Sequence, residues 1–502
     1  MVSSRDFYLA WRFAIEKDFV NAAGKAFEYA PDGERAWGDE SRHIKLDKVT
    51  KTAVMNSDHS ILAVPVGPQI HLFDSNYQPT RVLEMHSQPV SSVHFQPNNP
   101  TTLLSTSDES DASLGPIITI WDLSNPSPVP TLRPSDLDHI TVSATTNITT
   151  QLSALSIPLS EENQSHLRAS LLTPILQSLT RHTISQHRTL KGRLLTSFQS
   201  PIFSPSGDFL LYLPGPRPPS NSDTKWDLKV HSMTAGHDTL TLSGHRDAIM
   251  WAGFSPCERL IGTASWDGTC RIWDAKTGEE KFVFRTEKQN WTGGWAPDGG
   301  MFAGTSGDGR VRVWEMGEGR EVVDLDCFAS WCRALDWSAD GGMLVVGGRG
   351  GKMVLVDLGE EEVVVQERKL SLSKMVPKEK WEMMGRVFLE TSRVQFADGG
   401  RKIVFLTSGD ASIEICDLVK GLKWRFERPI PEAGGDESAE IARTLDFQVL
   451  DGSSPGGLTI LSTDTDGIRV WSIRETDHSV AHDNQALHDQ VEEGLIPGRD
   501  EL

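Results

Sequence analysis

Short apolar runs, separated by turns rich in Gly, Asp and Ser, recur along this chain. In residues 244–274 the first run ends at Phe254 and the second leads into the turn "SWDG". The third run ends at Trp273 and Asp274. Runs of this length bounded by such turns predict antiparallel β-strands. This stretch is therefore predicted to form consecutive strands of one sheet.

The same order of strands and turns returns in residues 290–315 and 331–357. The aromatic residue that ends the first strand of each unit is Phe254, then Trp295, then Trp337, at spacings of 41 and 42 residues. That period is typical of a propeller blade. Five weaker copies span 51–74, 90–122, 197–215, 391–417 and 443–471, with Met55, Phe95, Phe203, Phe396 and Phe447 at the equivalent position. Eight units predict one all-β propeller over residues 43–473, with eight blades, or seven if residues 197–215 do not complete a sheet.

Three segments interrupt or follow the repeat. Residues 124–195 form the longest insertion, and residues 161–183 within it carry apolar positions at helical spacing, with Pro174 expected to kink the helix. We expect this insertion to be partly helical or disordered, and a helix that binds a partner is the alternative reading. Residues 359–386 form a charged insertion that could extend an outer strand. The acidic tail, residues 474–502, is expected to be disordered.

The best-preserved unit resembles the WD-repeat β-propeller family. It has the Gly244-His245 start, the Ser265, Asp267 and Gly268 turn, and the Trp273-Asp274 end. The resemblance implies a structural hydrogen-bond group, whose members would be His245, Thr263, Asp267 and Trp273. The buried indole N–H needs an acceptor, which Thr263 can supply while it donates onward to His245. A catalytic triad is the alternative for this cluster, and blade packing already explains it.

Closure of the ring is predicted to join the two ends of the repeat. Residues 43–50 precede the first unit and could supply the outer strand of the last blade beside residues 467–473. A closed ring protects sheet edges that would otherwise pair with other chains.

The family resemblance also indicates where partners bind, namely on the top face around the central channel. The position that projects there lies four residues before the first-strand aromatic. We call the eight residues at this position the rim residues: Lys51, Ser91, Gln199, Met250, Trp291, Arg333, Ser392 and Arg443. Three cations, a Trp and a Met fit a peptide with acidic or apolar anchors, although residues here could instead only line a water-filled channel. Trp251 and Trp266 are further aromatic candidates, with core packing as the alternative.

Composition narrows the partner class. The chain has 69 Asp and Glu against 49 Lys and Arg, a formal net charge of -20, which disfavours nucleic acid as a general partner. The alternative is a nucleic-acid-associated propeller that uses Lys51, Arg443 and the basic residues 181–193. The five cysteines show no metal-ligand spacing and are expected to be reduced and buried. No metal or other cofactor is expected.

Catalytic and targeting signals are weak. Residues 347–354 superficially resemble a phosphate-binding loop, but Val346 and Met353 break the pattern, and residues 463–467 lack the closing Glu of a calcium loop. The charged N-terminus excludes a signal peptide, no apolar run is long enough to span a membrane, and the final RDEL is read as a chance match to a retrieval signal. We therefore expect a non-enzymatic, cytoplasmic or nuclear interaction scaffold that is a monomeric subunit of a larger complex with protein partners.

Overall fold

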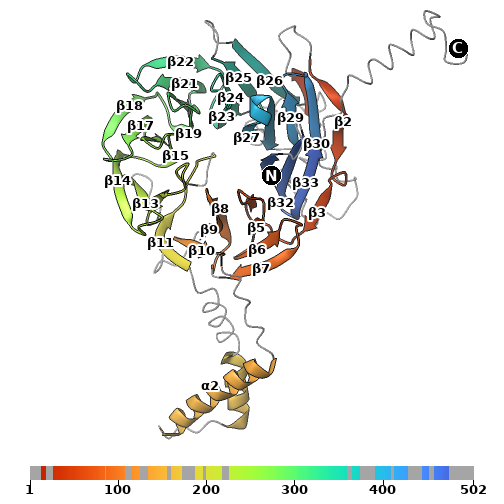
Figure 1. The fold of residues 1–502 in the computed structure, drawn as a ribbon, viewed down its shortest axis with the longest axis vertical. Helices are drawn as coiled ribbons and strands as arrows, with labels where there is room; N and C mark the ends of the chain where they lie inside the picture. Colours follow the sequence, from red (N-terminus) through yellow and green to blue (C-terminus); the bar gives the residue numbers. More distant parts are fainter. Residues whose placement is uncertain are drawn as a thin grey trace, which may run out of the picture.

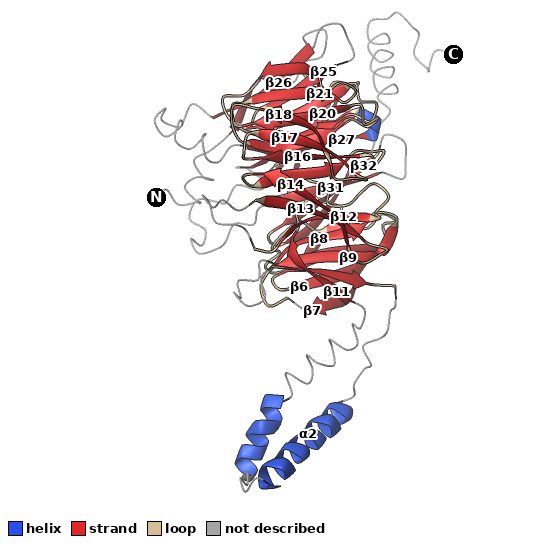
Figure 2. Ribbon diagram, turned by 90° about the vertical axis from the view of Figure 1, so that its left-hand side faces the viewer, coloured by secondary structure: helices blue, strands red, loops and turns tan. Residues whose placement is uncertain are grey.

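The structure is a ring of β-sheets arranged around a central opening (Figure 1). This computed structural model describes residues 13–17, 26–84, 86–107, 116–124, 134–154, 160–171, 187–195, 199–216, 225–349, 351–358, 364–372, 390–408, 412–427, 444–451 and 457–473. In side view the strands of successive sheets stack into a thick disc (Figure 2). The described residues form an all-β propeller, as the repeat predicts.

Four sheets have four strands each; in three of them the strands come from a single unit of the repeat and follow one another from the centre outwards, and in the last the outer strand comes from the N-terminal part of the chain. The first comprises β4 (Val54–Met55), β5 (Ile61–Val66), β6 (Gln69–Asp74) and β7 (Pro79–Glu84). Next along the chain are β15 (Ile249–Phe254), β16 (Leu260–Ser265), β17 (Thr269–Asp274) and β18 (Glu280–Arg285), followed by β19 (Asn290–Trp295), β20 (Met301–Ser306), β21 (Arg310–Glu315) and β22 (Glu321–Asp326). The last consists of β31 (Thr444–Asp451), β32 (Leu458–Asp464) and β33 (Gly467–Ile473), completed by β3 (Arg42–Lys45).

Two sheets carry a fifth strand from the N-terminal part of the chain. One contains β23 (Cys332–Trp337), β24 (Met343–Gly348), β25 (Met353–Asp357) and β26 (Val364–Leu372), with β1 (Phe13–Lys17) outside β26. The other contains β27 (Glu390–Ala397), the short 3-10 helix η1 (Asp398–Gly400), β28 (Lys402–Ser408), β29 (Ile413–Asp417) and β30 (Leu422–Glu427), with β2 (Glu28–Ala36) outside β30.

One sheet has seven strands and joins two units of the repeat. It runs through β8 (Val90–Gln96), β9 (Asn99–Ser107), β10 (Ile117–Asp122), β11 (His187–Arg193), β12 (Phe209–Pro214), β13 (Trp226–Ser232) and β14 (Asp238–His245). Gly192 permits the close contact between β11 and β12, since a Cβ there would lie 2.6 Å from the Leu213 carbonyl oxygen. In the second of these units the innermost strand is reduced to an isolated β-bridge between Phe203 and Leu210. Eight units of sequence thus form seven hydrogen-bonded sheets among the described residues, and the number of blades stays a prediction.

The ring closes between β3 and β33, as the sequence predicts. These strands pair antiparallel, with Arg42 opposite Val470 and Lys45 opposite Gly467. Gly467 has a φ of 143° and its Cα lies so close to β3 that a Cβ would meet the Ile44 carbonyl oxygen. The outer strand of the last sheet therefore comes from a segment more than 400 residues earlier in the chain.

Strands β1 and β2 lie before residue 43, the predicted start of the propeller. Strand β2 pairs with β30 in parallel, and its register shifts between Tyr29 and Glu34. Within that bulge Asp32 accepts a 2.9 Å hydrogen bond from the Trp424 indole, while Arg35 stacks over Phe426 at 6.0 Å. Sheet pairing therefore begins earlier in the chain than the repeat indicates.

Apolar side chains pack between neighbouring sheets, and glycines allow aromatic rings to fill the gaps. A Cβ on Gly262 or Gly293 would lie 2.6–2.7 Å from the ring of Phe302, which is fully buried. Phe284 stacks on Trp314 and Phe426 on Trp471, in each case with ring centroids 4.6 Å apart. The two ring pairs join the sheet of β15–β18 to that of β19–β22, and the sheet of β27–β30 to that of β31–β33.

The described parts of the insertions combine helix and strand. Helix α2 (Pro134–Ala154) and helical residues 161–171 lie outside the ring in Figure 2. The end of the 124–195 insertion forms β11, and the 359–386 insertion contributes β26, because both pair with the third strand of their unit. The tail 474–502 lies outside the described residues. No helix in the described part of the chain is both long and apolar enough to cross a membrane.

Candidate partner-binding face

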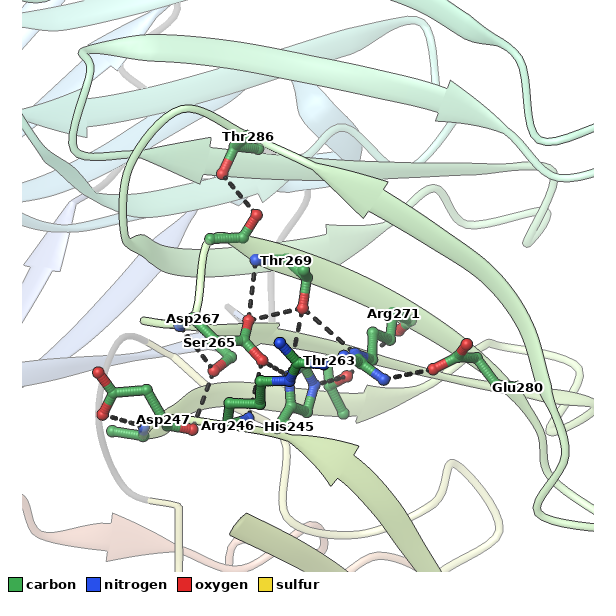
Figure 3. A network of polar contacts seen from close by, with 12 residues as sticks. His245, Arg246, Asp247, Thr263, Ser265, Asp267, Thr269, Arg271, Glu280 and Thr286 are labelled. Carbon is green, nitrogen blue, oxygen red and sulfur yellow. Dashed lines mark hydrogen bonds and ion pairs between the residues drawn. The ribbon is translucent and has the colours of Figure 1, made fainter. Parts of the chain in front are cut away.

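A buried hydrogen-bond network connects the strands of the best-preserved unit (Figure 3). The Trp273 indole N–H donates to the Thr263 hydroxyl at 3.0 Å, and Thr263 lies 2.7 Å from His245 Nε2. His245 Nδ1 lies 2.8 Å from Asp267 Oδ2. The chain of contacts is consistent if Thr263 donates to a neutral imidazole that donates to the carboxylate.

The protonation of this network follows from its burial. Burial lowers the pKa of His245 and favours the neutral ring. Burial alone would raise the pKa of Asp267, but hydrogen bonds from His245, Thr269 and the Arg246 backbone lower it. The His and Asp side chains are 1% and 6% exposed, so the group is closed to a substrate. The four predicted residues lie together, in a position that holds strands in register.

The seven rim residues in the described part of the chain lie at or just before the start of the inner strands, on the face that we call the top face. Four of them, Lys51, Ser91, Gln199 and Ser392, line a cavity of about 750 Å³ in the channel. A second cavity of about 590 Å³ is lined mainly by residues near the other ends of the inner strands. The two cavities share Val54, His94, Gln199, Ser200 and Asp336. These five residues therefore lie where the two cavities meet, and we call this part of the channel the waist.

Gln199 crosses this waist. Its side-chain Nε2 donates a 2.7 Å hydrogen bond to the carbonyl oxygen of Val394, which lies in β27, four units of the repeat further along the ring. The backbone of Gln199 is left-handed, with a φ of 58°, a conformation that non-glycine residues rarely adopt. Gln199 is therefore a rim residue whose side chain makes an intramolecular contact, a hydrogen bond that links two parts of the ring across the channel.

Two ionisable residues at the waist have shifted pKa values. Burial lowers the pKa of His94 to about 4, which keeps the ring neutral at pH 7. Burial raises the pKa of Asp336 to about 6, although Asp336 Oδ2 accepts a 2.7 Å hydrogen bond from the Phe396 amide. Neither residue was identified from sequence, because neither occupies the rim position.

Carboxylates near the rim neutralise part of its positive charge. Arg333 Nη1 lies 3.2 Å from Glu390 Oε2, and Arg393 Nη1 lies 2.9 and 2.8 Å from the two oxygens of Asp446. Thr52 also donates to Asp446, at 2.8 Å. None of the rim residues is acidic. Two carboxylates lie close to rim positions in sequence, however: Glu390 is two residues before Ser392, and Asp446 is three residues after Arg443. The face is consequently less cationic than the eight residues alone indicate.

Trp291 and Arg333 do not line either channel cavity and form a group with Trp266. Met250, which lines neither cavity, packs against the same apolar cluster as Trp266. Trp266 and Trp291 are half-buried, with ring centroids 5.2 Å apart in an edge-on arrangement. The Arg333 guanidinium lies 4.3 Å from the Trp291 ring. Trp251, the other aromatic candidate, is 2% exposed and packs in the core. Arg443 lies outside the described residues.

Three parts of the chain, residues 77–114, 236–274 and 291–315, match the family model of the WD domain, G-beta repeat. The second match contains His245, Thr263, Asp267 and Trp273.

Similar proteins are known in plants and animals. Over 308 residues the chain is 23% identical to the Arabidopsis thaliana Periodic tryptophan protein 2, a match that covers 56% of this chain and 31% of that protein. It is 28% identical over 131 residues to the human Angio-associated migratory cell protein, covering 26% of this chain and 29% of the relative. It is also 32% identical over 111 residues to human Coronin-7, covering 21% and 12%.

The matched regions thus span less than a third of the length of these relatives. The chain thus carries WD repeats in three regions, and its described residues form a ring of antiparallel sheets that contains the His–Asp–Thr–Trp network.

Proposed function

We propose that this chain is a non-enzymatic interaction scaffold that docks partner peptides or domains on its top face as one subunit of a multiprotein complex. The observation that carries the proposal is the pair formed by Trp291 and Arg333 on the top face, where both side chains are half-exposed and the guanidinium lies 4.3 Å from the indole ring. Large aromatic and Arg side chains dominate the energy of protein interfaces. The buried His and Asp of the blade network are committed to structure, which leaves them no catalytic role.

The proposed setting is the cytoplasm or the nucleus, with protein partners. The alternative, a nucleic-acid-associated propeller that uses Lys51, Arg443 and residues 181–193, receives less support, since the chain has a formal net charge of -20. That alternative predicts binding to RNA or DNA that falls steeply as salt rises.

The test compares partner recovery from cells by tagged variants. Lys51→Glu combined with Arg333→Gln changes two rim residues, and Lys276→Glu, in the exposed turn on the opposite face, is the matched control. We expect the double variant to lose at least one partner that the wild type and the control retain, with its melting temperature within about 3 °C of wild type. Recovery of the same partners by all three proteins would refute top-face docking.

A further inference from the structure

A line of aromatic rings crosses the top face over three successive sheets. Trp266 follows β16, Trp291 lies in β19, and Trp331 precedes β23. The Trp291 and Trp331 centroids lie 6.1 Å apart, and the Trp266 and Trp291 centroids 5.2 Å. All three residues are half-buried, so each packs against the ring of sheets and also reaches solvent.

Two arginines stack on these rings. The Arg333 guanidinium carbon lies 4.3 Å from the Trp291 ring and 5.1 Å from the Trp331 ring, which places it between them. Arg349, after β24, lies 4.7 Å from the Trp331 ring. A guanidinium that stacks by its flat face keeps its N–H donors in the plane, where they meet carboxylates side-on.

The arginines are held in place by further contacts. Arg349 Nη1 donates to the Ser330 hydroxyl at 3.2 Å, and Arg333 contacts Glu390 at 3.2 Å. The charges of Arg333 and Arg349 both act on the Glu390 carboxyl. Two guanidinium groups beside half-buried aromatic rings are complementary to a ligand that carries both negative charge and an apolar group. We define Trp266, Trp291, Trp331, Arg333 and Arg349 as the Trp–Arg platform.

We propose that the Trp–Arg platform binds an acidic peptide segment of a partner protein through its carboxylates and one large apolar or aromatic side chain. The carboxylates pair with Arg333 and Arg349, and the apolar side chain packs on Trp266 and Trp291. This inference rests on the proposed scaffold function. It places the main contact with the partner on the three sheets that contain β15–β26, and not in the channel. A nucleic acid also offers rings and negative charge, but the acidic chain repels a long polyanion more strongly than a short peptide.

The test uses defined probes and the full chain. Fluorescein-labelled 12-residue peptides of Asp and Ser, with or without one central Phe, are titrated by fluorescence anisotropy. A peptide with Lys in place of Asp and a 12-nucleotide oligouridylate are measured in parallel. We expect the acidic Phe peptide to bind tightest, and removal of its Phe or replacement of its Asp residues to weaken binding at least tenfold.

Variants then locate the site. Arg349→Glu is expected to weaken the acidic Phe peptide at least tenfold, Arg349→Lys to weaken it less, and Lys276→Glu to leave it unchanged. If Arg349→Glu does not fold, as judged by circular dichroism, Arg349→Gln is used with the same expectation. Equal affinity for all peptides, tighter binding of oligouridylate, or full binding by a folded Arg349 variant would overturn the proposal.

The outcomes separate this inference from the scaffold function. If Lys51→Glu with Arg333→Gln loses cellular partners while no acidic peptide binds, the scaffold function stands and the acidic class is wrong. If acidic peptides bind at Arg349 while the double variant keeps every partner, the platform is real and the rim residues are not the docking site.

Discussion

At the scale of single residues, the shared side chains of the repeat stabilise the fold and the variable ones face solvent. Thr263 is fully buried and links Trp273 to His245, so one hydroxyl serves two partners. Because those partners are buried as well, removing the hydroxyl leaves polar groups unsatisfied, which costs more than the bond itself contributes.

Thr263→Val is therefore expected to lower the free energy of unfolding by about 2–4 kcal/mol, since the Trp273 N–H and His245 Nε2 both lose their contact. Thr241→Val, on the exposed face of β14, is the control and should change it by less than about 0.5 kcal/mol. Urea denaturation followed by fluorescence measures both. Equal values for the two variants would mean that the network is energetically unimportant.

Asp336 gives a prediction about pH. Its folded-state pKa is about 6, above the usual value of 3.8, so between pH 4 and 6 the folded protein binds more protons than the unfolded chain. The free energy of unfolding contributed by this residue consequently falls as pH rises through that window. The substitution Asp336→Asn removes the charge but keeps an oxygen that can accept the hydrogen bond from the Phe396 amide.

We expect Asp336→Asn to flatten the stability profile between pH 4 and 6 and to raise the free energy of unfolding at pH 7 by about 1–3 kcal/mol. Asp326→Asn, at a carboxylate that is 70% exposed, is the control. Denaturation curves at pH 4, 5, 6 and 7 provide the measurement. A variant as pH-sensitive as the wild type would show that Asp336 is ionised throughout.

At the scale of elements, the N-terminal strands tie three sheets together. Beside β3, Arg469 of β33 is 4% exposed and lies 2.6 Å from Asp464, 3.5 Å from Glu40 and 4.0 Å from the Trp37 ring. Loss of the N-terminal segment would expose the edge of β33 and remove two of these contacts of a buried cation. Such losses are costly in a closed ring.

Deletion of residues 1–50, which removes β1, β2 and β3, is thus expected to abolish the cooperative thermal transition. Deletion of residues 1–25 removes β1 alone and should keep it. Calorimetry and circular dichroism distinguish the two. An unchanged melting temperature after the longer deletion would contradict closure by β3.

Periodic patterns predicted most of these elements, and a local turn signal concealed one. The 41–42-residue spacing of Phe254, Trp295 and Trp337 located the sheets. The predicted pairing of residues 43–50 with the Gly467–Ile473 strand is confirmed by the pairing of β3 with β33. Strand β2 was missed because its centre reads Pro31-Asp32-Gly33, which normally marks a turn. The structure uses that turn as a bulge opposite Trp424. The stacking of Trp331 with Arg349 was not predictable, because loops from different strands bring them together.

At the scale of the whole molecule, Gln199 connects two units four apart around the ring. Gln199→Ala removes the side-chain amide but keeps a Cβ at the left-handed φ of 58°, so it tests the contribution of the hydrogen bond to Val394. We expect a loss of about 1 kcal/mol in the free energy of unfolding and faster amide exchange in residues 390–397. Lys51→Ala, at an exposed residue of the same cavity, is the control. An unchanged rate of amide exchange in β27 would show that the hydrogen bond between Gln199 and Val394 does not stabilise this strand.

The pairing of β3 with β33 also has a consequence for biosynthesis. Residues 42–45 leave the ribosome early but cannot find their partner until residues 467–473 have been translated. At about 5–20 residues per second, the nascent chain waits roughly 20–90 s in an open form. During that interval β3 has no partner strand, so the unfinished ring is expected to need chaperones that shield unpaired edges. Slow assembly, rather than low final stability, is the expected cost of a ring that joins its first strands to its last.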